Sequence, residues 1–169
     1  SGQRDAYIPA LEAGDITLFP EYSGNLLQFF DPETTARTSD DVYAALPDAL
    51  SLSARDVVLP VVPMFHANAW GLPFSTPATG AKLVLPGRHS DGESLANLIA
   101  AEGVTIAVGV PTIWMGLVDY LDASDLQLPS LQRIMVGGAP MHPALMKRIE
   151  DRGICVQTTW GMTELSPLG

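Results

Sequence analysis

From residue 56 onward, short apolar strands alternate with longer helical patterns, and this alternation constrains the fold more than any other feature of the chain. Five strands are predicted, at residues 57–62, 82–85, 104–110, 133–136 and 154–158. Between the strands, an irregular helical pattern interrupted by prolines covers residues 65–79. Three regular helical patterns cover residues 91–102, 111 onward and 143–152. Such alternation is typical of helices packed on a mostly parallel sheet. We therefore expect an α/β fold with a mostly parallel five-stranded sheet and flanking helices.

Side chains on the predicted helices are expected to divide into buried apolar faces and solvated charges. In the helix that begins at Pro111, apolar residues recur at helical spacing, so its buried face should hold Ile113, Leu117, Tyr120 and Leu121. Four basic residues are expected to be solvated charges on helices and loops: Arg88, Lys147, Arg148 and Arg152.

The first part of the chain differs in pattern and in charge. Residues 1–50 hold nine Asp or Glu against two Arg, a net charge of −7, whereas residues 51–169 carry only −3. Short helical and strand-like pieces are broken by Gly14 and Pro20, and Thr38 with Asp41 indicates a helix capping box. We expect a small α+β N-terminal segment at residues 1–46, ahead of a second unit at residues 47–169, because such a split suggests different histories.

Composition excludes several classes of protein. The net charge of −10 argues against a surface for nucleic acid or for an anionic membrane. Cys155 is the only cysteine, so no internal disulfide scaffold is possible, and its spacing to the three histidines predicts no structural zinc. The longest apolar run, residues 57–65, contains two prolines and is too short to cross a bilayer, so no transmembrane segment is expected.

Two turns are expected to meet at one edge of the sheet. Gly137-Gly138-Ala139 follows the fourth predicted strand, and Trp160 to Glu164 follows the fifth. The carboxyl ends of parallel strands share an edge, which is where ligands bind in such sheets. A single Gly-Gly turn is usually only a turn. Two turns together favour a pocket, in which Trp160 offers a face for a base, Thr163 a hydroxyl for a phosphate and Glu164 a carboxylate for Mg²⁺.

A third candidate position follows the first strand of the predicted sheet. His66 and Trp70 lie just beyond its carboxyl end. A histidine beside apolar residues is commonly a core residue, but this position equally favours a pocket. Trp70 is, on composition alone, more often a core residue.

Seven strings of the chain match one family in order and spacing. They are residues 45–50, 56–66, 68–70, 80–87, 109–112, 136–140 and 160–167. Residues from about 45 to 169 thus resemble the central part of the AMP-forming fatty-acyl-CoA synthetases of the medium- to long-chain group. This resemblance implies a partial N-terminal domain of an adenylate-forming enzyme, which joins a carboxylic acid to ATP as an acyl-adenylate and then passes the acyl group to CoA.

The resemblance also assigns roles by position. It implies nucleotide contacts from seven residues: Gly137, Gly138, Ala139, Trp160, Gly161, Met162 and Thr163. Thr163 and Glu164 would be the catalytic pair, and Glu164 would bind Mg²⁺. His66 and Trp70 would lie against the acyl substrate, with Trp70 as the aromatic gate of the fatty-acyl tunnel. ATP/AMP, Mg²⁺ and CoA are the implied cofactors, and the implied location is cytoplasmic.

Parts of the family's catalytic apparatus have no counterpart in these 169 residues. The phosphate loop, the ribose-binding Asp and the catalytic Lys are all missing from the chain. Adenylation needs electrostatic stabilisation at the α-phosphate, so we expect the chain alone to be inactive. Unpaired sheet edges further predict self-association.

A second resemblance covers residues 1–46, through the strings at residues 10–27 and 40–46. They are similar to the substrate-binding proteins of glycine-betaine and choline importers, which are extracytoplasmic. Tyr22 would border the quaternary-ammonium site, although cation–π binding needs several aromatic faces. The hypothesis that follows is a chimera or join near residues 44–50. Two alternatives to a ligase stay open: a quaternary-ammonium binding module, and a non-enzymatic chain with a relic pocket.

Overall fold

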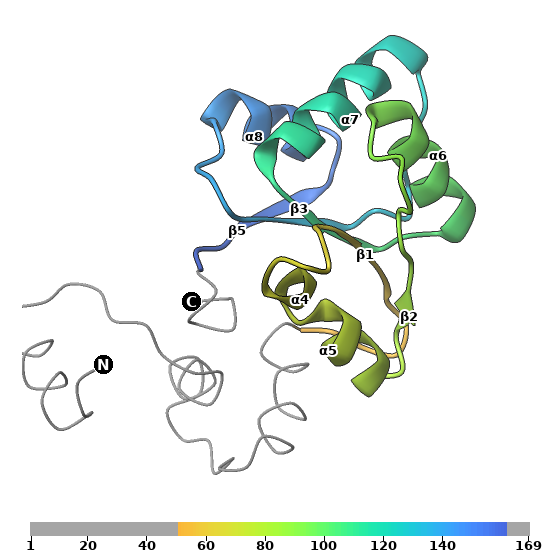
Figure 1. Cartoon of the computed structure of the whole chain (residues 1–169). Coiled ribbons are helices and arrows are strands. Elements are labelled where there is room, and N and C mark those ends of the chain that lie inside the picture. Colours follow the sequence, from red (N-terminus) through yellow and green to blue (C-terminus); the bar gives the residue numbers. More distant parts are fainter. Residues whose placement is uncertain (1–50, 162–169) are drawn as a thin grey trace, which may run out of the picture.

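Five parallel strands form the centre of residues 51–161, the part of the chain that the computed structural model describes (Figure 1). The strands are β1 (Val57–Val61), β2 (Lys82–Leu83), β3 (Ile106–Gly109), β4 (Arg133–Val136) and β5 (Cys155–Thr158). Their order across the sheet is β2-β1-β3-β4-β5, and every adjacent pair is parallel. The predicted α/β fold with a parallel sheet is confirmed.

Helices cover both faces of this sheet (Figure 1). On one face lie three helices, α6 (Gly92–Glu102), α7 (Pro111–Ser124) and α8 (Pro143–Glu150). On the other face lie two shorter ones, α4 (Ala67–Trp70) and α5 (Leu72–Ala78). Since successive side chains of a strand point to opposite faces, each strand contributes to two apolar layers.

The two layers differ in size. The larger one joins strand residues such as Leu59, Ala107 and Ile134 to the inner faces of α6 and α7. The smaller one joins the alternate strand residues, such as Val58 and Val108, to α4 and α5. The sheet is therefore held most extensively on the side of α6 and α7.

Helix α7 is rotated relative to the predicted face. Leu117 and Leu121 are buried as expected, but Ile113 and Tyr120 are only half-buried, and the other fully buried positions are Trp114 and Val118. The indole Nε1 of Trp114 donates a hydrogen bond to the carbonyl of Gly109, at 3.2 Å. This bond, made across the turn from β3 into α7, draws the large ring into the core.

The stretch predicted as an irregular helix is two short helices, α4 and α5, and α4 is an unusual left-handed turn. Four consecutive residues, from Ala67 to Trp70, have left-handed φ values between 45° and 58°. Gly71, also left-handed at 74°, then precedes α5. Left-handed conformations cost L-residues roughly 1–2 kcal/mol each, so surrounding contacts must hold this turn. Trp70 supplies one such contact, because its side chain is buried in the smaller apolar layer.

The expectation of solvated basic residues omits the ion-pair partners of two of them. Lys147 is 74% exposed and pairs only with Asp151 at the end of its own helix. Arg148 of α8 and Arg152 in the turn after α8 instead reach carboxylates on α7, and Arg152 is only 20% exposed. Helical spacing alone could not reveal these partners, because they lie on a different helix.

Several predictions fall outside the described residues. They are the α+β segment at residues 1–46, its boundary with the second unit, Tyr22, and the end of the chain from Met162 onward. Among residues 51–161, no helix is long and apolar enough to cross a membrane.

Candidate functional site

Two turns meet at the carboxyl edge of the sheet and enclose a pocket of about 570 Å³. Strands β4 and β5 are paired so that Val136 lies opposite Thr158, and the chain leaves both strands at the same level. The Thr159 N–H donates to the Val136 carbonyl at 2.7 Å and closes the gap between the turns. The pocket is lined by Val136, Gly138, Ala139, Pro140, Met141, Thr158, Thr159, Trp160 and Gly161.

The first wall depends on two glycines. A Cβ on Gly137 would lie 2.8 Å from Cη2 of Trp70 and 3.0 Å from Cγ2 of Thr159, so only glycine fits between them. Gly138 has φ +76°, a conformation that L side chains rarely adopt. The chain thus turns sharply after β4 and leaves its backbone open to a ligand.

The second wall carries the pocket's aromatic side chain. Trp160 is 51% exposed, whereas Trp70 and Trp114 are buried in the apolar layers. A large flat side chain left exposed at a pocket is suited to stack on a ring and to donate through its indole N–H. The geometry therefore offers one aromatic face next to an open backbone turn.

The lining is uncharged. Among the described residues that line the pocket, none carries an ionisable side chain. Within residues 51–161, no group of three or more His, Cys, Asp or Glu is placed to hold a metal ion. The described part of the site thus combines an aromatic face, an open backbone turn and the side chains of Thr158 and Thr159.

His142 caps the N-terminus of α8, next to the loop that lines the pocket. Its Nδ1 accepts a hydrogen bond from the Ala144 N–H at 3.2 Å, and its carbonyl accepts from the Leu145 N–H at 2.9 Å. These bonds satisfy donors at the helix start that would otherwise be orphaned. The loop that lines the pocket, from Gly138 to Met141, therefore runs into a capped helix.

The structure brings together four of the predicted nucleotide residues: Gly138, Ala139, Trp160 and Gly161. Gly137 lies beneath them, buried against the Trp70 ring. His66 is exposed and is not among the lining residues. Met162, Thr163, Glu164 and Tyr22 lie outside the described residues, so their predicted roles stay predictions.

Five of the lining residues had no role predicted from the sequence: Val136, Pro140, Met141, Thr158 and Thr159. The signal was available, because each one flanks a predicted motif at the end of a predicted strand. Pairing the two strands in parallel register would have placed them in the same pocket.

Comparison with known proteins identifies one family. A family model described as "AMP-binding enzyme" matches residues 34–169. The match begins ahead of the predicted boundary at residue 46, and that boundary stays a prediction.

Two curated relatives illustrate the likeness. A medium-chain-fatty-acid–CoA ligase of Ectopseudomonas oleovorans is 53% identical over 126 residues, which are 74% of this chain and 23% of that protein. A long-chain-fatty-acid–CoA ligase of Thermus thermophilus is 49% identical over 125 residues, again 74% of this chain and 23% of that protein. The chain thus spans less than a quarter of the length of these relatives.

A solved structure agrees with the fold. The crystal structure of a long-chain-fatty-acid–CoA ligase from Archaeoglobus fulgidus superposes with a TM-score of 0.66 at 26% identity, covering 76% of this chain and 28% of that one. These matches give no support to the quaternary-ammonium alternative or to a non-enzymatic chain.

Proposed function

Because the chain belongs to the AMP-binding enzyme family, we propose that it forms the adenine-binding part of a ligase that activates a medium- or long-chain fatty acid with ATP and transfers it to CoA. In this reaction a carboxylate oxygen forms a bond to the α-phosphorus of ATP, and pyrophosphate leaves. The thiol of CoA then attacks the acyl carbon, and AMP leaves. The described residues would hold the nucleoside through both steps.

The observation that supports this function most directly is the pocket between the β4 and β5 turns. Its backbone is open at Gly138, its aromatic face is Trp160, and the described residues of its lining are uncharged, which is compatible with a neutral purine ring. The size of about 570 Å³ falls within the usual range for small-molecule sites. Ala139 and Gly161 complete the walls without bulky side chains.

The remaining roles belong to the same proposal. Thr163 would hydrogen-bond a phosphate oxygen, and Glu164, a carboxylate, is a suitable ligand for Mg²⁺. The buried ring of Trp70 contacts Gly137, so an acyl chain gated by Trp70 would lie close to the nucleoside. His66 would approach the acyl group from the exposed loop after β1. We expect the ligase to act in the cytoplasm, and the chain alone to form no acyl-CoA.

Binding of a non-hydrolysable acyl-adenylate tests the proposal. The sulfamoyl analogue of decanoyl adenylate, at a hundred times its dissociation constant, should stabilise the 169-residue chain by about 2.7 kcal/mol. Thermal unfolding should therefore shift upward by several degrees. Trp160→Ala should weaken binding at least fivefold or so, since stacking of a base on an aromatic side chain is worth roughly 1–3 kcal/mol.

Leu85→Ala provides the matched control. Leu85 is about as exposed as Trp160, but it follows β2, at the opposite edge of the sheet. Its removal should leave the dissociation constant unchanged. A cooperative unfolding transition that no analogue concentration moves would refute an adenine site in this chain.

A further inference from the structure

Helix α8 connects the two walls of the pocket. It begins at Pro143, directly after the loop that lines the first wall, and its far end leads through Gly153 into β5 and on to Trp160. A tilt of α8 would therefore move both walls. The position of this helix decides how well the pocket fits a ring.

Apolar contacts hold α8 only weakly. Ile149 is its one buried residue, and Leu145 and Met146 are half-buried. In contrast, α7 buries four side chains and is anchored in the larger apolar layer. A helix with so little buried surface needs another constraint to keep one orientation.

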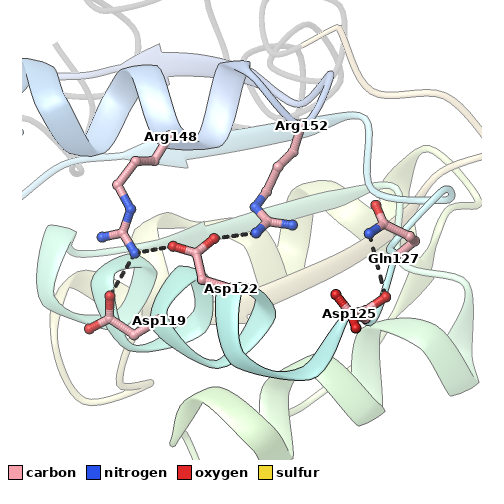
Figure 2. A network of polar contacts seen from close by, with 6 residues as sticks. All are labelled: Asp119, Asp122, Asp125, Gln127, Arg148 and Arg152. Atoms are coloured by element: carbon pink, nitrogen blue, oxygen red, sulfur yellow. Dashed lines mark hydrogen bonds and ion pairs between the residues drawn. The ribbon is translucent and has the colours of Figure 1, made fainter.

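Ion pairs between α8 and α7 supply that constraint (Figure 2). Nη2 of Arg148 lies 2.8 Å from Oδ1 of Asp119 and 2.5 Å from Oδ2 of Asp122. Arg152 pairs with the other oxygen of Asp122, which thus binds both arginines. Hydrogen bonds from Arg148 and Arg152 hold the pKa of Asp122 below its ordinary value.

The spacing of these residues explains why they meet. Asp119 and Asp122 are three apart on α7, a spacing that places both carboxylates on one face of that helix. Arg148 lies on α8, and Arg152 lies in the turn that follows it. Figure 2 shows the two carboxylates of α7 directed toward the guanidinium groups of Arg148 on α8 and of Arg152 in the turn after it.

We propose that the Asp119–Asp122–Arg148–Arg152 network is a positioning device for the pocket, which fixes the tilt of α8 on α7 and thereby the spacing of the β4 and β5 turns. The expected effect on ligand binding rests on the adenine site proposed above. The expected effect on the two turns does not. Exposed ion pairs add little to global stability, so losing them should loosen α8 without unfolding the sheet.

Asp122→Asn is the decisive variant, because it removes the charge that binds both arginines. Amide hydrogen exchange in the 169-residue chain reports on the walls without any ligand, through the hydrogen-bonded N–H groups of Gly137, Leu145 and Thr159. These amides should exchange about three to ten times faster in the variant, while amides of α6 stay unchanged. The dissociation constant of the decanoyl-adenylate analogue should rise by a similar factor.

Lys147→Met is the matched control. Lys147 lies on the same helix and forms an ion pair with Asp151, at the end of α8, that does not reach α7. Like Asp122→Asn, this substitution removes one charge, here from α8 rather than α7. It should nevertheless leave exchange in the turns and analogue binding unchanged. Asp122→Glu, which keeps the charge, should restore at least part of the protection.

The outcomes separate this inference from the proposed function. Faster exchange at the turns in Asp122→Asn supports the positioning role even if the parent chain binds no analogue, which would count against the adenine site alone. Unchanged exchange at the turns, or an equal rise in α6, overturns the positioning role. If Asp122→Asn does not fold, Asp119→Asn removes only one of the three ion pairs, and the same comparison then decides.

Discussion

The interior of the sheet and its β5 edge are stabilised in different ways. At β1 and β3, the strands are buried on both faces and α6 and α7 pack over them through a continuous apolar layer. At β5, three of four strand residues are exposed, and the neighbouring α8 buries only Ile149. Apolar contacts alone cannot hold β5 and α8 in place, so polar contacts between the helices contribute a larger part of the stabilisation there.

This contrast places the pocket at the less stable end of the molecule. Segments with few buried apolar contacts open at lower free energy than the core does, and binding loops are commonly drawn from such segments. The α6–α7 side provides a rigid base, whereas the α8–β5 side can adapt to a ligand. Substitutions on the two sides should therefore have different consequences.

Edge strands show the same difference in another form. Among the described residues, β5 pairs with β4 alone, and at the other edge β2 is only two residues long. A short edge strand offers little for another chain to pair with, and a longer exposed one offers more. Self-association of the chain, if it occurs as predicted, is thus expected through β5.

The largest effect is expected from Trp114→Ala on the rigid side. The side chain is fully buried, and its loss leaves a large cavity and removes the hydrogen bond to the Gly109 carbonyl. Such truncations cost about 3–5 kcal/mol, a large part of the stability of a domain of this size. Chemical denaturation should show a much lower midpoint or no cooperative transition. Met115→Ala, at the half-exposed neighbouring position, should change little, and equal losses for the two would contradict the assignment of the core.

A smaller effect is expected from Gly137→Ala, beneath the pocket. The added Cβ would lie 2.8 Å from the Trp70 ring, and overpacking of this kind costs about 1–3 kcal/mol. Because the Thr159 side chain would also be displaced, analogue binding should weaken together with stability. Gly116→Ala, in the interior of α7, is the control with the same chemical change. A Cβ there would lie 4.0 Å from the Gly92 nitrogen, an ordinary contact, so the substitution should be neutral or slightly stabilising. Unfolding midpoints of both variants measure the difference.

Much of the fold could be predicted because it depends on local patterns. The five strands and the order of helices follow from apolar periodicity, and the two turns of the pocket follow from glycine-containing strings after Val136 and Thr158. Parallel pairing then requires these turns to share an edge. Periodicity also located Leu117 and Leu121 in the core.

Features that depend on contacts between distant residues could not be predicted in this way. The left-handed turn at Ala67–Trp70 has no glycine within it, and its conformation depends on where the Trp70 ring packs. The rotation of α7 depends on the hydrogen bond from Trp114 to Gly109. The pairing of Arg148 and Arg152 with α7 depends on how two helices are placed on the sheet.

The smallest effect is expected from lowering the pH, which tests the ion pairs between α7 and the α8 region. The pKa of Asp122 is lowered by hydrogen bonds from Arg148 and Arg152, so its ionised form is favoured in the folded chain. A carboxylate with a lowered pKa stabilises the fold above its ordinary value of 3.8, and this contribution is lost as pH falls through the folded pKa below 3.8. At pH 7, Asp122→Asn should therefore unfold at a lower temperature than the parent chain.

As pH falls through the lowered pKa of Asp122, the two unfolding temperatures should converge, because a protonated Asp122 is as neutral as asparagine. Asp56 and Asp91 also have lowered pKa values, so both proteins should lose stability in acid, and only the difference between them reports on Asp122. Burial opposes ionisation of Asp56, but hydrogen bonds from Ser53 and Thr105 outweigh it and lower its pKa. Thermal unfolding followed by circular dichroism from pH 7 to pH 2.5 measures this difference. A constant difference across that range would mean that the α7–α8 ion pairs contribute through packing rather than through charge.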